Sequence, residues 1–136
     1  MRVCVDSAVF VRAWIKKQDG HAEARRFVDR IFAGEIVADC PYLVLVETVA
    51  AIARVEGVEE SRAAARTLMR TADFSASDAN LHLAAINHAQ RALLKGADAL
   101  IVAHAQERGI PLVTVDDEQF ERGKAIVKTL RPQEVR

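Results

Sequence analysis

The chain has 136 residues, of which 51% are hydrophobic and 5% aromatic, and 19 basic residues balance 19 acidic ones to give a formal net charge of zero. This length suits one domain that buries its own core, and the composition excludes a disordered chain. The missing basic surplus speaks mildly against a nucleic-acid partner, unless divalent cations neutralise some of the carboxylates.

Short apolar strands alternate with amphipathic helices along the first half of the chain. Strands are predicted at residues 3–6 and 36–38, where brief apolar runs end at polar residues. Apolar residues at helical spacing, with glycine or proline at the boundaries, predict four helices at residues 9–17, 21–32, 41–54 and 59–70.

The alternation continues through the second half. A strand is predicted at residues 73–76, and Ser77 is a candidate N-cap for a helix that reaches Leu94. Gly96 interrupts the pattern before the next helix. Phe120 is placed on a short turn or helix. The remaining predicted elements are a helix at 97–108, a strand at 111–115 and an edge strand at 125–128. Without repeats or linkers, residues 1–136 are expected to form a single domain.

Strands that alternate with helices predict a mostly parallel sheet with helices on both faces. Such a sheet binds its ligand beyond the carboxyl ends of its strands, where the strand order reverses. Asp6 directly follows the first predicted strand, and Asp116 directly follows the strand that ends at Val115. The two carboxylates are therefore expected on the same rim, although either could simply cap the helix that follows it.

Two further acids stand alone in apolar surroundings. Glu47 is the only ionisable residue between Leu43 and Ala53, whereas a solvated helix face carries charges every three or four residues. Asp98 opens an apolar helix, where the helix dipole favours a carboxylate. Glu47 either lies on a narrow exposed strip or points into a polar pocket, and Asp98 is either an ordinary N-terminal acid or part of that pocket.

The four acids together favour metal chemistry. Clustered carboxylates repel one another and need a positive partner, and hard oxygen ligands without His or Cys favour Mg²⁺ or Mn²⁺. Two such ions would activate a water and stabilise the leaving oxygen in hydrolysis of a phosphodiester. The sequence contains no Gly-rich phosphate loop and no Ser-His-Asp or Cys-His arrangement, and its four histidines share no ligand spacing.

Short segments around these acids, taken in order, resemble the PIN-domain family and, within it, the VapC-type toxins of bacterial toxin–antitoxin pairs. The opening strand ends in Asp followed by Ser, and a later strand carries Thr-x-Asp with a Phe behind it. The Gly-Ala-Asp-Ala-Leu-Ile-Val-Ala segment is the closest match. The segments are residues 5–7, 41–47, 96–103, 111–116 with Phe120, and 127–134 with Pro132.

The resemblance implies a three-layer α/β/α sandwich with a mostly parallel sheet of four to five strands. It also implies a magnesium- or manganese-dependent endoribonuclease whose catalytic acids are Asp6, Glu47, Asp98 and Asp116, with Asp6, Asp98 and Asp116 holding the metal. RNA would be the substrate, and a homodimer and a small antitoxin protein are the implied partners. The chain departs from the family at residues 41–47, where five residues separate the Pro from the Glu.

The fourth acid has two candidates, because Asp117 adjoins Asp116. Thr114 two residues before and Phe120 four residues after favour Asp116, and Asp117 either assists it or points to solvent. Ser7 and Thr114 each neighbour a site acid, and we expect them either to orient carboxylates or to be ordinary cap and strand hydroxyls.

Three basic side chains are weaker candidates for the site than the acids. Arg12, Arg91 and Lys95 are candidates for holding substrate phosphate at the rim, and the alternative for all three is ordinary surface solvation. The apolar excess of the helix at residues 43–53 suggests a dimer surface.

The cellular setting is predicted from what the chain lacks. Cys4 and Cys40 fit no metal or redox spacing and are expected to be buried thiols. The first residues do not form a secretory signal, and no apolar run is long enough for a membrane span. A soluble cytoplasmic protein without a membrane partner is the expectation.

Two other functions are compatible with strand-end acids. A phosphotransfer or phosphatase domain of the haloacid-dehalogenase or response-regulator type also uses such an Asp. The former needs Asp-x-Asp where this chain has Asp6-Ser7-Ala8, and the latter needs an acidic pair after the first strand, which is absent here. A PIN-like scaffold without metal is the non-enzymatic alternative, and loss of one of the four acids would mark it.

Overall fold

Five short strands form one parallel sheet in the computed structural model, which describes residues 1–136. The strands lie in the order β3-β2-β1-β4-β5, and every neighbouring pair is parallel. Their bounds are β1 Arg2–Val5, β2 Val37–Pro41, β3 Asp73–Ser75, β4 Leu112–Val113 and β5 Thr129–Leu130. The predicted parallel sheet is confirmed, and the first strand of the chain is its centre.

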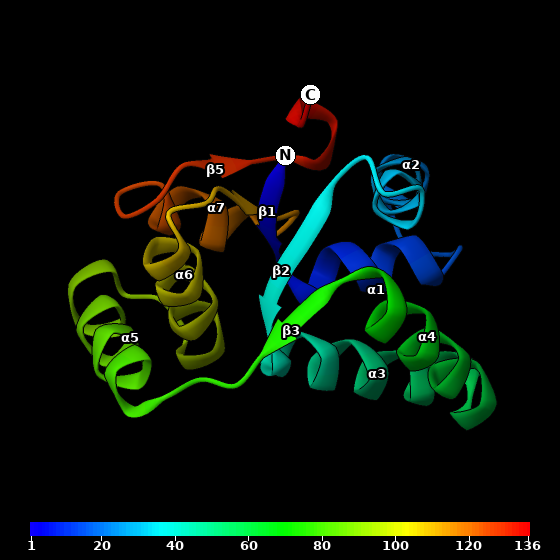
Figure 1. The fold of residues 1–136 in the computed structure, drawn as a ribbon, viewed down its shortest axis with the longest axis horizontal. Helices are drawn as coiled ribbons and strands as arrows, with labels where there is room; N and C mark the ends of the chain where they lie inside the picture. Colours follow the sequence, from blue (N-terminus) through cyan, green and yellow to red (C-terminus); the bar gives the residue numbers. More distant parts are fainter.

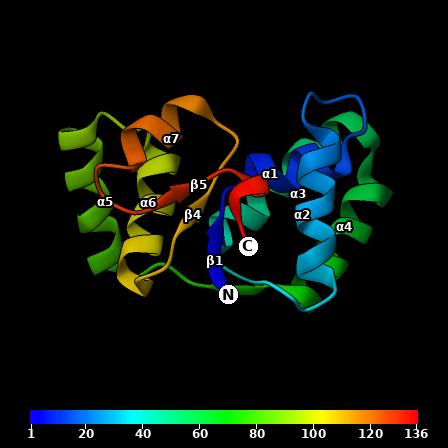
Figure 2. The same ribbon diagram turned by 90° about the horizontal axis from the view of Figure 1, so that it is seen from above.

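Helices cover both faces of this sheet and complete the expected three-layer sandwich. Helices α1 to α4 gather on one side of the sheet and α5 to α7 on the other, as the two perpendicular views show (Figures 1 and 2). The helices are α1 Ser7–Trp14, α2 His21–Phe32, α3 Tyr42–Glu56, α4 Val58–Thr71, α5 Ala79–Ala92, α6 Gly96–Arg108 and α7 Asp117–Gly123, with a 3₁₀ turn η1 at Pro132–Glu134. None of the helices is both long enough and apolar enough to cross a membrane.

The central strand is buried on both faces. Val3, Cys4 and Val5 are fully buried, because helices from both layers pack against β1. This burial explains why the strand is a continuous apolar run without alternation. Cys4 and Cys40 are free, buried thiols, as predicted.

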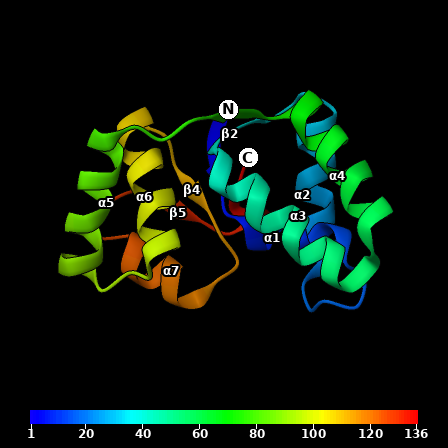
Figure 3. The ribbon, with the colours of Figure 1, turned by 90° about the horizontal axis from the view of Figure 1, so that it is seen from below.

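The strand order reverses between β1 and β4. The chain leaves β1 toward β2 and β3, and it returns on the opposite side of β1 through β4 and β5. Backbone hydrogen bonds join the two strands at this point, including one from the Asp6 amide to the Val113 carbonyl at 3.0 Å. Seen from below, α3 and α6 flank the reversal (Figure 3). A crevice beyond the carboxyl ends of β1 and β4 is therefore the expected ligand site.

Most predicted boundaries shift by one to three residues in the structure, and the end of the sheet and the start of α5 differ for a clear reason. The last strand lies at Thr129–Leu130 and not at residues 125–128, because the amides of Ile126 and Val127 both donate to Gly123 and hold that segment in a turn. Asp78, not Ser77, caps α5, since its carboxylate accepts from the Leu81 amide at 2.8 Å. The predicted break between two helices is confirmed, but it lies at residues 93–95, and Gly96 is the first residue of α6.

A buried polar cluster ties the second strand to α6. Asp39 on β2 is 4% exposed and accepts hydrogen bonds from His104 on α6, at 2.9 Å, and from Arg2, at 3.0 Å. Burial alone would raise the pKa of Asp39, but these two donors outweigh it and lower that pKa below its usual range. His104 is therefore a structural residue.

Candidate active site

Asp6 stands at the junction of β1 and α1 and is 4% exposed. It is the N-cap residue of α1, yet its side chain accepts no capping hydrogen bond. One Oδ atom lies 3.3 Å from the Thr114 hydroxyl, which belongs to the segment after β4. The carboxylate is thus not used to cap the helix, and it faces the neighbouring strand end.

Glu47 lies in the middle of α3 and is half-buried. Its Oε1 accepts a hydrogen bond from the Ser7 hydroxyl at 3.2 Å. Since Ser7 follows Asp6 directly, this bond brings the lone acid of α3 to the end of β1. Of the two positions that the sequence allowed for Glu47, the exposed strip is therefore not the one in the structure.

Asp98 lies in the first turn of α6 and is partly buried. Its side chain makes no capping bond, and the N-cap residue of the helix is Lys95. The ammonium of Lys95 is close enough to Asp98 to lower the pKa of that carboxyl, and it also lies 3.8 Å from Glu118. Lys95 therefore borders the acid cluster.

Asp116 and Asp117 take different directions. Asp116 caps α7 by accepting from the Gln119 amide at 2.7 Å, and it is close enough to Asp98 to raise the pKa of that group. The side chain of Asp117 is 92% exposed and pairs with Arg131 at 2.6 Å. Asp116 therefore joins the acid cluster while also serving as a cap, and Asp117 points away from it.

Burial and mutual repulsion set the charge state of the cluster. Burial raises the pKa of Asp6 to about 7, and the charges of Asp98 and Glu47 add to the increase. Burial also raises the pKa of Asp98 to about 6, with further contributions from Asp116 and Glu47. Raised pKa values of this kind show that the negative charges are unfavourable where they stand, so either bound protons or a bound cation would relieve the repulsion.

The donor set fits a hard divalent cation, because it consists of carboxylates and hydroxyls without a thiolate or imidazole. No three His, Cys, Asp or Glu side chains lie at ligand spacing in the structure. The four acids lie close enough to raise one another's pKa, since Asp98 and Glu47 act on Asp6, and Asp116 and Glu47 act on Asp98. The expected set is thus gathered in one place without being in coordination geometry.

Gln119 is a buried site residue that the sequence did not reveal. Its side chain is fully buried on α7, its Oε1 lies 2.8 Å from the Thr114 hydroxyl, and its Nε2 has no partner. A half-turn of the amide makes Nε2 the donor to Thr114 and frees the Thr114 proton for Asp6. Thr114 also accepts from the Asp116 amide at 3.1 Å, so it links three groups of the site.

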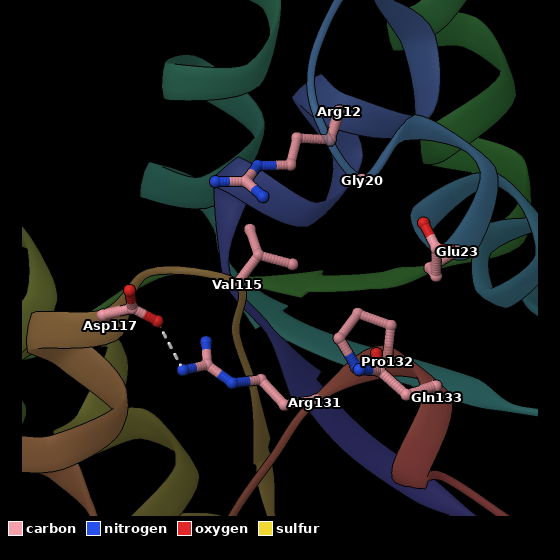
Figure 4. A pocket seen from close by; sticks show the side chains of 8 residues that line it. All are labelled: Arg12, Gly20, Glu23, Val115, Asp117, Arg131, Pro132 and Gln133. Carbon is pink, nitrogen blue, oxygen red and sulfur yellow. Dashed lines mark hydrogen bonds and ion pairs between the residues drawn. The ribbon is translucent and has the colours of Figure 1, made fainter.

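The two remaining basic candidates lie in different places. Arg12 lines a pocket of about 290 Å³ together with Val115, Asp117 and Arg131 (Figure 4), and Val115 directly precedes Asp116 in the chain. Arg91 lines a separate pocket between α5, α6 and α7 with His88, Gln106 and Glu121. The structure therefore brings Arg12 and Lys95 to the rim of the site and leaves Arg91 elsewhere.

The family model of the PIN domain matches residues 3–125 of this chain. The chain belongs to the PIN-domain family. The four acids and the strand reversal described above all fall within the matched PIN-domain region. No curated protein is significantly similar to the chain in sequence.

Solved structures share this PIN-domain fold over their whole length. VapC20 of Mycobacterium tuberculosis, described as a sarcin-ricin-loop-cleaving toxin, superposes with a TM-score of 0.73 at 20% identity and covers 96% of this chain and 99% of its own. VapBC2 of Rickettsia felis, solved with a promoter DNA fragment, gives a TM-score of 0.73 at 15% identity, with 96% and 98% covered. A toxin–antitoxin complex from Klebsiella pneumoniae gives 0.68 at 18% identity, with 99% and 100% covered.

Proposed function

We propose that this PIN-domain protein is a divalent-metal-dependent endoribonuclease and the toxin of a toxin–antitoxin pair. The observation that carries the proposal is the gathering of Asp6, Glu47, Asp98 and Asp116 at the strand reversal, with the pKa of Asp6 raised to about 7. The fold it shares with a toxin described as cleaving the sarcin-ricin loop supports RNA as the substrate. Family membership, together with the absence of an acidic pair after the first strand, speaks against the phosphotransfer alternative.

Three of the four acids share one role in the proposed site, and Glu47 has another. Asp6, Asp98 and Asp116 hold Mg²⁺ or Mn²⁺, and Glu47 completes the negative rim while Ser7 holds its side chain in place. In such sites a divalent cation supplies activation of the attacking water and stabilises charge on the leaving oxygen. Thr114 keeps Asp6 and Asp116 in a fixed relative position through its hydroxyl.

The partners are proposed on the same basis. Several of the solved relatives are complexes of a toxin with its antitoxin, which supports a small antitoxin protein for this chain as well. Helix α3 exposes Tyr42 and Val46, one helical turn apart, with exposed fractions of 46% and 59%, and this apolar face is the proposed homodimer surface. A toxin of this kind would act in the cytoplasm, where its RNA substrate is found.

A cleavage assay tests the proposal. Protein purified without a partner is incubated with structured RNA and Mg²⁺, and cleavage is expected to stop when a chelator is added. Asp6→Asn should reduce cleavage by more than about 100-fold, since loss of groups that merely orient ligands already costs about 10–100-fold.

Two results would contradict the proposal. Cleavage that continues in the chelator would exclude a metal site. Normal cleavage by Asp6→Asn would exclude this set of acids. A protein that binds RNA but never cleaves it would support the alternative of a catalytically inactive PIN-fold binding protein or scaffold.

A further inference from the structure

A basic pocket adjoins the acid cluster on the side of α1 and η1. Val115, next to Asp116 in the chain, forms its floor, and Arg12 and Arg131 approach from opposite sides of Val115 (Figure 4). The remaining lining residues are Gly20, Glu23, Asp117, Pro132 and Gln133. The pocket therefore lies next to the strand end that carries Thr114 and Asp116.

The guanidinium of Arg131 is held in position before any ligand arrives. It lies 4.2 Å from the centre of the Phe120 ring, and it donates to the Thr114 carbonyl at 3.4 Å. Its side chain is only 24% exposed, whereas the side chain of its ion-pair partner Asp117 is 92% exposed. A fixed cation is thus paired with a carboxylate that is free to swing into solvent.

Arg12 supplies a second cation without a partner. Its guanidinium forms no ion pair in the structure, and it passes within 3.2 Å of the position that a Cβ on Gly20 would occupy. Gly20 has a φ of +77°, so this residue allows both the turn and the close approach of the arginine. Glu23 opposes the two arginines, but its carboxylate lies 3.6 Å from Arg26 and is partly neutralised by it.

We propose that this pocket binds a backbone phosphate of the RNA, next to the one that is cleaved, between Arg12 and Arg131. The proposal rests on the proposed ribonuclease function and adds the position of the substrate. Guanidinium groups bind phosphate oxygens through paired hydrogen bonds, and two of them converge on one cavity here. The phosphate takes the place of Asp117 on Arg131, so Asp117 competes with the substrate in the free protein.

Binding of a short fluorescein-labelled single-stranded RNA tests the pocket. Fluorescence anisotropy is measured with Mg²⁺ at several KCl concentrations, in proteins that also carry Asp98→Asn to prevent cleavage. Arg131→Gln and Arg12→Gln should each weaken binding about tenfold. Each should also lower the slope of log affinity against log salt by about 0.7, the contribution of one phosphate contact on single-stranded RNA.

Asp117→Asn provides the opposite prediction. It removes the competing carboxylate, so RNA binding should tighten by about two- to fivefold.

Arg70→Gln is the matched control for the two arginine variants. Arg70 is an exposed arginine in the last turn of α4, just before β3 begins at the opposite rim of the sheet. Arg70→Gln makes the same change in net charge as Arg131→Gln and Arg12→Gln, and it should leave both the affinity for RNA and the salt slope near those of the parent protein.

Several outcomes would overturn the pocket assignment. These are an Arg131→Gln protein with unchanged affinity and slope, a loss no larger than that of Arg70→Gln, or an Asp117→Asn protein that binds more weakly. Arg131→Lys, which keeps the charge, should recover part of the affinity if the Gln variant is folded poorly. Cleavage by the unmodified protein is measured separately, so normal cleavage with unaffected pocket variants refutes this inference and leaves the ribonuclease proposal standing.

Discussion

Asp6 destabilises the folded protein when it is ionised. An ordinary aspartate has a pKa near 3.8, but burial and the charges of Asp98 and Glu47 raise the pKa of Asp6 to about 7. Between these two values the folded chain keeps a proton that the unfolded chain releases. The free energy of unfolding therefore falls as the pH rises from about 4 to about 7, and it stays low above pH 7. Asp98 adds to this trend over a narrower interval, because its pKa is raised to about 6.

Stability measured against pH tests this directly. Without divalent cations, the midpoint of thermal unfolding should be higher at about pH 5 than at about pH 8, apart from contributions of other groups. Asp6→Asn removes the buried charge, so it should stabilise the metal-free protein at about pH 8, although the same variant is expected to lose cleavage. Added Mg²⁺ should stabilise the unmodified protein and have much less effect on the variant. An Asp6→Asn protein that is less stable at every pH would contradict the raised pKa.

The neighbouring acids Asp116 and Asp117 should differ sharply in cleavage. Asp116→Asn is expected to lose more than about 100-fold in cleavage rate, whereas Asp117→Asn should keep cleavage within about tenfold of the unmodified protein. The reason is that Asp116 faces Asp98, while Asp117 pairs with Arg131 outside the cluster. Initial rates with Mg²⁺ present check the comparison, and the reverse order would exchange the roles of the two residues.

At the scale of elements, α6 is placed by a buried hydrogen bond at one end and presents Asp98 at the other. His104 lies near the end of α6, where Asp39 of β2 accepts its hydrogen bond at 2.9 Å, and Asp98 lies in the first turn of the same helix. The helix is buried along most of its length, including Ile101, Val102 and Ala105. The position of α6 along β2 therefore determines where Asp98 lies.

His104→Ala should lower the free energy of unfolding by about 1–3 kcal/mol, because it leaves a buried carboxylate oxygen of Asp39 without its donor. His82→Ala is the matched control, since His82 is exposed on α5 and should change stability by less than about 0.5 kcal/mol. Chemical unfolding at neutral pH measures both. Equal stability of the two variants would show that the pair does not hold α6 in place.

The parts of the site that lie on strand ends could be predicted from the sequence. Asp6 and Asp116 follow apolar strands, and the rule for parallel sheets places such residues on one rim. Glu47 and Asp98 were conspicuous because their helices are otherwise apolar. It was harder to predict whether Asp116 or Asp117 joins the cluster. The two residues are adjacent at the start of α7, and the residue at which the helix begins decides which carboxylate faces the other acids.

Gln119 and Arg131 carried no sequence signal of their own. A buried glutamine in a short polar helix looks like a surface residue, and its contact with Thr114 depends on how α7 packs beneath the site. Arg131 acquires its setting from Phe120 and Thr114, which are 11 and 17 residues away in the chain. The misplaced last strand has a similar cause, since hydrogen bonds to Gly123 hold residues 125–128 in a turn despite their apolar pattern.

At the scale of the whole molecule, the exposed apolar face of α3 tests the proposed dimer. Val46 is 59% exposed, and Val46→Glu should shift the protein from dimer to monomer by placing a charge in a buried interface. Met69→Glu on α4 is the matched control, because Met69 is also 59% exposed. Sedimentation velocity measures the mass of each variant. A monomeric parent protein, or a Val46→Glu protein that remains dimeric, would contradict the assignment of this face.

The strand order also determines when the site can first exist. Asp6 lies near the start of the chain, and its hydroxyl neighbour Thr114 follows 108 residues later. Ribosomes add about 5–20 residues per second, so β1 waits several seconds without its β4 neighbour during synthesis. Until then Asp6, Glu47 and Asp98 lack the neighbouring strand end that carries Asp116. The proposed metal site can therefore assemble only after its fourth acid has been synthesised and β4 has paired with β1.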